Sequence, residues 1–273
     1  MIRKERWVKK IYRRGFWFVA QRVMCEIDEK CLKERTIVFS PHPDDETLGC
    51  GGTITKMRAL GGDVTIVVMT DGRRSHHKFI SENRLKALRA EEAIQANKVL
   101  GGKKAHLIFF EFEDGKLMKN KAEAIEKVRN ILQVKEPRQV FIPYDGETPS
   151  DHLAANQIVM EAIKGYEKPL RIYQYPIWFW THWPWVGLPK QSIRSFVSGI
   201  KYCLISGYRL AKDFRSFVCI ESATDTKRDA LAQYKTQMTR ISGNPEWPIL
   251  HDVANGEFLE CFFQDREIFY QCK

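Results

Sequence analysis

Residues 40–52, SPHPDDETLGCGG, place one histidine and three consecutive acids directly after an apolar run and directly before a cluster of glycines. Three adjacent carboxylates repel one another, and a fold gains nothing by gathering them where a strand ends. The pattern therefore predicts a binding site for something positively charged at this point of the chain.

His42 and Asp45 are three residues apart across the turn from strand to helix, so a bend can direct both to one point while Asp44 projects at a different angle. Pro43 restricts the bend, and the glycines that follow allow close approach of the backbone. An imidazole with a carboxylate suits Zn²⁺, and a catalytic zinc usually takes three protein ligands and a water whose pKa it lowers to about 7. We predict that His42 and Asp45 bind zinc and that Asp44 takes the proton of the water.

A third ligand should come from the end of another strand. Residues 144–156, YDGETPSDHLAAN, follow the apolar run 139–142, and Asp151-His152 opens a helical stretch there, so His152 is the best candidate. Cys50 is a conceivable soft ligand, but within a glycine-rich helix start we expect it to pack against the sheet. We expect structural or solvent-exposed roles for the other histidines, which are His76, His77, His106, His182 and His251.

Apolar, β-branched runs alternate with helical periodicity along most of the chain. The candidate strands are residues 36–39, 64–69, 106–112, 139–142 and 171–175, and the candidate helices are residues 47–60, 82–100, 121–133, 152–164 and 226–237. Strict alternation predicts right-handed βαβ units in a Rossmann-like α/β fold, with helices flanking a mostly parallel sheet. Sites on such sheets lie beyond the carboxyl ends of strands, which is where the acidic motif lies.

The chain has 273 residues, of which 44% are hydrophobic, and this suffices for one large core. We expect a single α/β domain over residues 34–273, preceded by a basic segment over residues 1–33. An aromatic and basic elaboration is expected at about 176–215, where four of the seven tryptophans fall within eight residues. The last 35 residues contain strand-like and loop-like pieces.

The net charge of +10 is concentrated at the N-terminus, because residues 1–22 hold eight Lys/Arg against Glu5 alone. The remaining chain is close to neutral, so no nucleic-acid partner is expected. Basic residues interleaved with aromatic ones, both in this segment and at 176–215, are typical of contact with the anionic inner face of a membrane. The alternative is a helix of residues 1–22 packed on the body, with the tryptophans in the core.

Seven scattered cysteines without a CxxC pair argue against a disulfide framework and indicate a reducing compartment. No run approaches the roughly 18 apolar residues of a membrane span. The apolar piece at residues 15–20 is too short for a signal-peptide core. We therefore expect a cytoplasmic protein, peripheral to the membrane if the basic segment binds it.

The motif PHPDDETLGCGGTI resembles the signature of the LmbE-like, PIG-L type zinc N-deacetylases. Further matches follow in that family's order: MTDG (69–72), RAEEAIQANKVLG (89–101), EFEDGKL (111–117) and SDHLAA (150–155). The resemblance covers roughly residues 34–165. It implies the family's α/β fold, zinc ligands at His42, Asp45 and His152, and a general base at Asp44.

The resemblance also implies two substrate contacts, Arg89 and a sugar-binding carboxylate at Asp114. Each residue has a simpler interpretation. Arg89 could pair with Glu92 on a solvated helix face, and Asp114-Gly115 could form only a turn.

One departure from the family pattern concerns the oxyanion. Members commonly read His-Pro-Asp-His, whereas this chain has Pro149 in place of the first histidine, which helps to stabilise the oxyanion. Loss of such a donor typically costs about 10² to 10³ in rate. Either zinc alone polarises the carbonyl or another group acts, the candidates being Arg89, His76, His77 and His182.

The leading hypothesis is a zinc-dependent hydrolase that removes the N-acetyl group from an N-acetylated amino sugar. The substrate would be of the N-acetylglucosamine type, lipid-linked or nucleotide-linked, and the products acetate and a free amine. The alternative is a basic, aromatic module that docks on a membrane or another partner and carries a degenerate active site. Metal content distinguishes the two, because a binding module needs no stoichiometric zinc.

Overall fold

The computed structural model describes residues 22–181 and 204–272, together with Ile11, Gly15, Trp17, Phe18, Trp185 and Val186. Most of the basic segment 1–22 therefore lies outside the described residues, as do His182 and Trp183 of the aromatic stretch. Among the described residues, no helix combines the length and the apolar character needed to cross a membrane.

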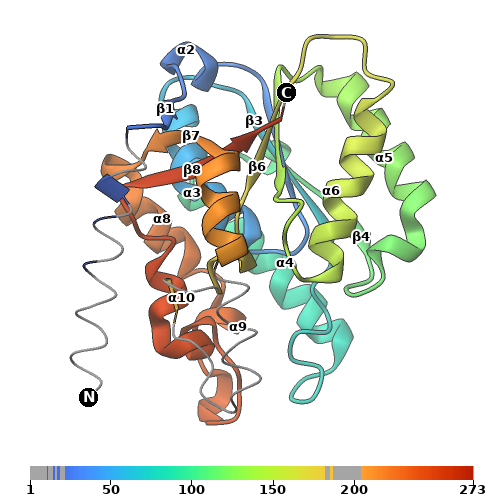
Figure 1. The fold of residues 1–273 in the computed structure, drawn as a ribbon. Helices are drawn as coiled ribbons and strands as arrows, with labels where there is room; N and C mark the ends of the chain where they lie inside the picture. The colour runs from blue at the N-terminus through green and yellow to red at the C-terminus, as the bar shows by residue number, and fades with distance from the viewer. Residues whose placement is uncertain are drawn as a thin grey trace.

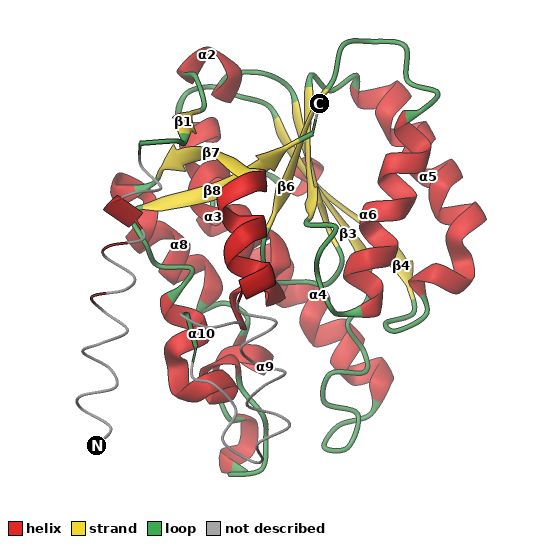
Figure 2. Ribbon diagram, viewed as in Figure 1, coloured by secondary structure: helices red, strands yellow, loops and turns green. Residues whose placement is uncertain are grey.

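A single sheet of eight strands, in the order β1-β7-β8-β6-β5-β2-β3-β4, forms the centre of the described structure (Figure 2). All of its neighbouring pairs are parallel except those that β8 makes with β6 and β7. The strands are β1 (Cys25–Glu26), β2 (Thr36–Ser40), β3 (Val64–Thr70), β4 (Leu107–Phe112), β5 (Gln139–Pro143), β6 (Arg171–Tyr175), β7 (Phe214–Cys219) and β8 (Arg266–Gln271).

Helices flank the sheet on both sides (Figure 1). The α-helices are α2 (Glu29–Leu32), α3 (Asp45–Ala59), α4 (Glu82–Val99), α5 (Lys121–Lys135), α6 (Ser150–Ile163), α8 (Thr224–Leu231), α9 (Lys235–Met238) and α10 (Glu257–Glu260). The 3₁₀-helices are η1 (Lys104–His106), η2 (Leu117–Asn120), η3 (Trp178–Thr181), η4 (Glu221–Ala223), η5 (Ile241–Gly243) and η6 (Leu250–Gly256).

The sheet separates two hydrophobic cores. Side chains of α5 and α6 pack against one face, and those of α3, α4 and α8 against the other. Successive residues of a strand point to opposite faces, so Ile37 and Phe39 of β2 enter the first core and Val38 enters the second. Both faces of β2 are therefore buried, as its uninterrupted apolar sequence indicates.

The predicted α/β fold is confirmed, and the five predicted strands and the helices predicted at 47–60, 82–100, 121–133 and 152–164 lie within a few residues of their expected positions. The single helix predicted at 226–237 is wrong, because the chain forms two helices there, α8 and α9, separated by residues 232–234. The two strands nearest the C-terminus, β7 and β8, are not among the predicted strands. The aromatic and basic elaboration expected at about 176–215 included no predicted strand, whereas β7 begins at Phe214. β8 enters antiparallel between β6 and β7, in the stretch that gave only strand-like pieces.

The strand order places the two chemical motifs side by side. β2 and β5 are neighbours at the centre, and the chain leaves β2 through α3 toward β3 but leaves β5 through α6 toward β6 on the other side. Ligand sites of open α/β sheets form where connections diverge in this way, beyond the carboxyl ends of the strands. Residues 41–44 follow β2, and residues 144–149 follow β5, at this point.

Glycines in α3 let the helix lie close to the sheet. A Cβ atom at Gly49 would collide with the ring of Tyr175, and one at Gly52 would lie 2.7 Å from Ile220 Cβ. The Tyr175 hydroxyl donates a hydrogen bond of 2.7 Å to the carbonyl of Phe39, so β6, β2 and α3 meet tightly. This packing fixes the first turn of α3, which carries Asp45.

Candidate metal and active site

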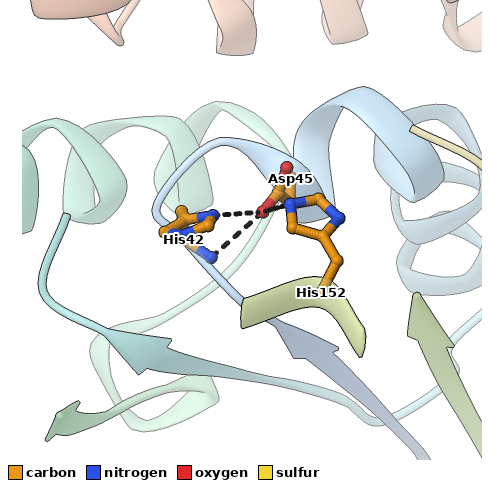
Figure 3. Close-up of side chains that lie close together, drawn as sticks. All are labelled: His42, Asp45 and His152. Carbon is orange, nitrogen blue, oxygen red and sulfur yellow. Dashed lines mark hydrogen bonds and ion pairs between the residues drawn. The ribbon is translucent and has the colours of Figure 1, made fainter. Parts of the chain in front are cut away.

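His42, Asp45 and His152 meet at the carboxyl ends of β2 and β5 (Figure 3). Asp45 Oδ2 lies 3.2 Å from His42 Nδ1 and 3.2 Å from His152 Nε2, and it also accepts a 3.0 Å hydrogen bond from the backbone N–H of His42. One ligand atom from each residue lies within 4.8 Å of the others. The structure thus brings together the three predicted ligands.

The donor set fits a divalent metal of the zinc type. Two imidazole nitrogens and one carboxylate oxygen leave room for a fourth ligand, as in catalytic zinc sites. His152 is fully buried, and although Nε2 faces Asp45 and Nδ1 faces Glu147, neither ring nitrogen makes a hydrogen bond of good geometry among the described residues. A buried polar atom without a well-formed hydrogen bond costs up to about 1–3 kcal/mol. A metal ion bound at Nε2 would remove that cost.

Two further carboxylates hold the other nitrogen of His42. Nε2 lies 3.3 Å from Asp114 Oδ1 and 3.4 Å from Asp151 Oδ2, on the side of the ring away from Asp45. Burial lowers the pKa of His42, but these carboxylates outweigh burial and raise the pKa well above its usual value. Carboxylates behind a ligating histidine fix its ring and its tautomer. Nδ1 is thereby left facing Asp45.

Glu147 is the carboxylate that lies behind the ring of His152, as Asp114 and Asp151 lie behind the ring of His42. Its Oε2 lies 3.5 Å from His152 Nδ1, and both side chains are fully buried. The same carboxylate accepts hydrogen bonds from the backbone N–H groups of Ile177, Trp178 and Phe179 at 2.8, 2.7 and 3.2 Å. Burial opposes the charged ring, but Asp45 and Glu147 together raise the pKa of His152 to about 9.

The backbone conformation of Asp44 gives its side chain a different direction from that of Asp45. Its φ of 122° is unusual for a residue with a Cβ atom and stores strain of order 1–3 kcal/mol. Its Oδ1 lies 3.1 Å from a guanidinium nitrogen of Arg89. Burial raises the pKa of Asp44 to about 7 although Arg89 acts in the opposite direction, whereas the pKa of Asp45 is held low because its histidine neighbours outweigh burial. Adjacent carboxyls thus have different proton affinities.

The third acid of the motif, Glu46, is a structural residue. Its carboxylate accepts hydrogen bonds from Ser40 Oγ, from the backbone N–H of Asp44, and from the hydroxyls of Thr47 and Tyr234. These bonds hold the turn between β2 and α3. The repulsion expected from three adjacent acids is relieved because each carboxylate has separate partners.

Arg89 and Asp114 both reach the site. Arg89 is buried in α4, donates to the Pro43 carbonyl, and does not pair with Glu92. Glu92 instead accepts bonds from the N–H and hydroxyl of Thr236, at 2.8 and 2.7 Å. Asp114 accepts a 3.1 Å bond from the N–H of Arg74, and although burial opposes ionisation, His42 lowers the pKa of Asp114 to about 2.

A pocket of about 310 Å³ opens above these residues. Its lining combines carboxylates and arginines with an apolar wall. Trp178 forms part of that apolar wall, with its ring stacked on Phe258 at a centroid distance of 5.1 Å. The lining residues are His42, Asp44, Asp45, Leu48, Arg74, Ser75, Arg89, Asp114, Pro149, Ile177, Trp178, Gln237, Leu250 and Phe258.

Pro149 lines the pocket where the family pattern has a histidine, and the proposed substitutes differ in position. Arg89 lines the pocket. His76 does not, because it is buried against Trp247 with Nδ1 2.9 Å from Ser75 Oγ and Nε2 2.8 Å from the Pro248 carbonyl. His77 is exposed and bonds the Arg74 carbonyl, and His182 lies outside the described residues.

Sequence reasoning missed the supporting acids. The position of Asp151, directly before His152 at the start of α6, could have indicated its role. Adjacent side chains at the start of a helix can face two neighbouring metal ligands. Glu147 gave no such signal, since the backbone N–H groups that it accepts from lie about 30 residues ahead, at Ile177, Trp178 and Phe179. Cys50 is buried with a raised pKa caused chiefly by burial, and it belongs to the core.

The comparison with protein families agrees with this geometry. Residues 37–163 match the family model described as PIG-L, GlcNAc-PI de-N-acetylase. The chain is 30% identical to the uncharacterized deacetylase YaiS of Escherichia coli, over 49% of this chain and 73% of that one. It is 27% identical to the 1D-myo-inositol 2-acetamido-2-deoxy-alpha-D-glucopyranoside deacetylase of Nocardia farcinica, over 80% of this chain and 85% of that one.

Another relative is the diacetylchitobiose deacetylase of Thermococcus kodakarensis, which is 30% identical over 48% of this chain; the match spans about half, 49%, of that relative's length. The fold is also that of the N,N'-diacetylchitobiose deacetylase of Pyrococcus horikoshii, with a TM-score of 0.61 at 20% identity, over 88% of this chain and 84% of that one. A chain with this fold, this ordered set of motifs and these relatives belongs to the PIG-L family of deacetylases.

Proposed function

We propose that the protein is a zinc-dependent hydrolase that removes the N-acetyl group from an N-acetylglucosamine-type sugar. The observation that carries this proposal is the convergence of His42, Asp45 and His152 beside Asp44, where all of these residues except the buried His152 line a pocket. The names of the relatives support it, because they describe deacetylases of N-acetylated sugars. A single domain over residues 34–273 is supported by the pocket, because Gln237, Leu250 and Phe258 line it together with residues of the first half of the chain.

Zinc held by His42, Asp45 and His152 would polarise the acetamide carbonyl and acidify the attacking water. Asp44 accepts the proton of the water as its oxygen forms a bond to the carbonyl carbon, and then returns the proton to the amine nitrogen as the C–N bond breaks. The products are acetate and a free amino sugar. A pKa near 7 suits a group that must both accept and donate a proton at neutral pH.

The other pocket residues position the reactants. Arg89 holds the Asp44 carboxylate by its ion pair and so keeps the proton acceptor aimed into the pocket. Asp114, which is ionised and fixed by the backbone of Arg74, can accept hydrogen bonds from sugar hydroxyls. Trp178 gives a rigid apolar wall against which a sugar ring can lie.

The test is acetate release by the zinc-loaded protein. Free, nucleotide-linked, lipid-linked and thiol-linked N-acetylglucosamine derivatives are supplied as substrates, with Asp44→Asn as the matched inactive control. Acetate released by the wild type and not by the control supports the proposal. A metal-loaded protein that releases acetate from none of them is instead the binding module with a degenerate site.

We also propose that the protein works in the cytoplasm at the surface of an anionic membrane. Five described cysteines, Cys25, Cys31, Cys50, Cys219 and Cys272, are free thiols, which agrees with a reducing compartment. The helical residues 204–213 expose Leu204, Ile205 and Tyr208 by 71%, 41% and 65%, next to the exposed cations Arg209 and Lys212. Apolar side chains bordered by cations are typical of an interfacial membrane contact.

Sedimentation with phosphatidylserine vesicles tests this contact. Binding at low salt should weaken as salt rises, and it should weaken in Leu204→Gln/Tyr208→Gln and after deletion of residues 1–22. Val134→Gln, which replaces another exposed side chain on α5, is the matched control. Absence of binding at low ionic strength would contradict the membrane contact and favour a soluble sugar as the substrate.

A further inference from the structure

The two arginines of the pocket wall are held differently. Arg89 is buried, and its guanidinium pairs with Asp44. Arg74 is exposed, and its guanidinium makes no ion pair or hydrogen bond within the described part of the chain. Nearby cations are occupied, since Arg73 binds Asp71 and Lys116 binds Glu113. A pocket-lining cation without a partner is therefore available to a ligand.

The backbone of Arg74 ties this free guanidinium to the wall that carries Asp114. Its N–H donates a 3.1 Å hydrogen bond to Asp114 Oδ2, and a Cβ atom placed on Gly115 would lie 3.4 Å from its Nη1. The carboxylate of Asp114 is turned to His42, 3.3 Å away, and does not form an ion pair with Arg74. A sugar that bonds Asp114 would thus place a substituent against the guanidinium.

We infer that Arg74 binds an anionic substituent, a phosphate or carboxylate, on the sugar substrate. This inference rests on the proposed deacetylase function and adds the class of substrate. A guanidinium presents a planar fork of donors that matches both anions, and charge-assisted bonds of this kind are about twice as strong as neutral ones. Without such a cation, Asp44, Asp45 and Asp114 would repel an anion that approaches this wall.

The experiment compares N-acetylglucosamine 1-phosphate with the neutral methyl glycoside of N-acetylglucosamine. Affinity is measured by titration calorimetry on zinc-loaded Asp44→Asn, which cannot turn the ligands over, and kcat/KM is measured on the otherwise wild-type enzyme. We expect a preference of about two- to fivefold for the phosphate, because one charge pair at an exposed position contributes about that factor. The preference should shrink as salt rises.

Three variants identify the residue responsible for the preference. Each is made both in the Asp44→Asn protein and in the otherwise wild-type enzyme. Arg74→Gln should abolish the preference, so that the affinity and kcat/KM for the phosphate fall to those for the methyl glycoside. Arg74→Lys should retain part of it, because a charge remains but the fork is lost. Lys78→Gln removes an equal charge from the same exposed loop, outside the pocket wall, and should change neither ligand.

The outcomes separate the inference from the function on which it rests. Equal handling of both ligands by the wild type overturns the inference. A preference that persists in Arg74→Gln also overturns it, because the phosphate then binds the metal or another group. Acetate release from the phosphate and from the methyl glycoside with equal kcat/KM contradicts the role of Arg74 but leaves the deacetylase function in place. Arg74-dependent binding without acetate release from any amide contradicts the deacetylase function and leaves an anion site.

Discussion

Glu147 and His152 face each other inside the protein, with Oε2 of the carboxylate 3.5 Å from Nδ1 of the ring. The remaining acceptor capacity of Glu147 is used by three consecutive backbone N–H groups at the start of η3, which supplies Trp178 to the pocket. One carboxylate therefore supports a predicted metal ligand and the apolar wall of the pocket. Metal affinity and substrate fit should both depend on it.

Glu147→Gln should lower zinc affinity by about 10- to 100-fold, the usual effect of losing a carboxylate behind a ligating histidine. The neutral amide cannot stabilise the Nδ1–H of His152 equally and cannot accept all three backbone bonds. Zinc affinity is measured by competition with a chromogenic chelator. Asp145→Asn, the same change at an exposed position two residues away, is the control and should bind zinc normally. Equal affinities for the two variants would contradict this role.

His42→Ala, Asp45→Ala and His152→Ala should each lose the stoichiometric metal of the purified protein. Each change removes one of only three protein ligands in the described site, and two ligands rarely hold a catalytic zinc. Elemental analysis of dialysed protein measures the loss. Retention of about one metal per chain in all three variants would refute the ligand assignment.

Asp44→Asn should retain the metal and lose at least ~10² in kcat/KM, because the amide keeps the shape of the side chain but cannot accept a proton. Glu46 is not a ready substitute, since its carboxylate is bound by Ser40, Thr47 and Tyr234. Acetate release and metal content are measured on the same preparation. Normal turnover would place the base elsewhere.

Activity should fall on the acid side as Asp44 takes up a proton. The pKa of Asp44 is about 7 without metal, and a bound cation favours the carboxylate and so moves this acid limb to lower pH. Arg89 also lowers the pKa of Asp44, so Arg89→Gln should move the limb to higher pH. The profile of kcat/KM against pH measures both positions, with Lys78→Gln as the control. A limb that stays in place or moves down would contradict the pairing.

The sequence predicted the local parts of this site well. His42 and Asp45 lie within one turn, and the apolar run before them fixes β2, so their convergence follows from local geometry. His152 could be found because it opens a helix after another strand, and parallel strands end at one edge. Glu147, by contrast, acts through backbone groups of η3, and a backbone N–H leaves no trace in residue types.

The C-terminal strands were missed for a related reason. β8 is antiparallel and pairs with β6 and β7, so its place depends on contacts between segments distant in sequence. Its residue Glu267 also reaches α3, where Oε1 and Oε2 accept hydrogen bonds from the N–H groups of Gly52 and Thr53 at 2.9 and 2.8 Å. No local pattern in the sequence indicates such an acid within the core.

Glu267 and Lys227 form a buried ion pair that links β8, α8 and the helix that carries Asp45. Lys227 Nζ lies 2.7 Å from Glu267 Oε1, and both side chains are almost completely buried. Lys227→Met should lower the free energy of unfolding by about 3–5 kcal/mol, because it leaves a carboxylate buried without its cation. Lys164→Met breaks the exposed ion pair with Glu161 and should change the free energy of unfolding by less than about 0.5 kcal/mol.

Urea denaturation of the metal-free protein measures both changes without a contribution from bound ligand. The double variant Lys227→Met/Glu267→Gln separates the lost cation from lost packing, since its amide carries no charge and still accepts one of the two α3 bonds. It should recover part of the stability lost in Lys227→Met. If the double variant is less stable than Lys227→Met, the hydrogen bonds from Glu267 to Gly52 and Thr53 hold α3 in place, and the buried charge is the smaller effect.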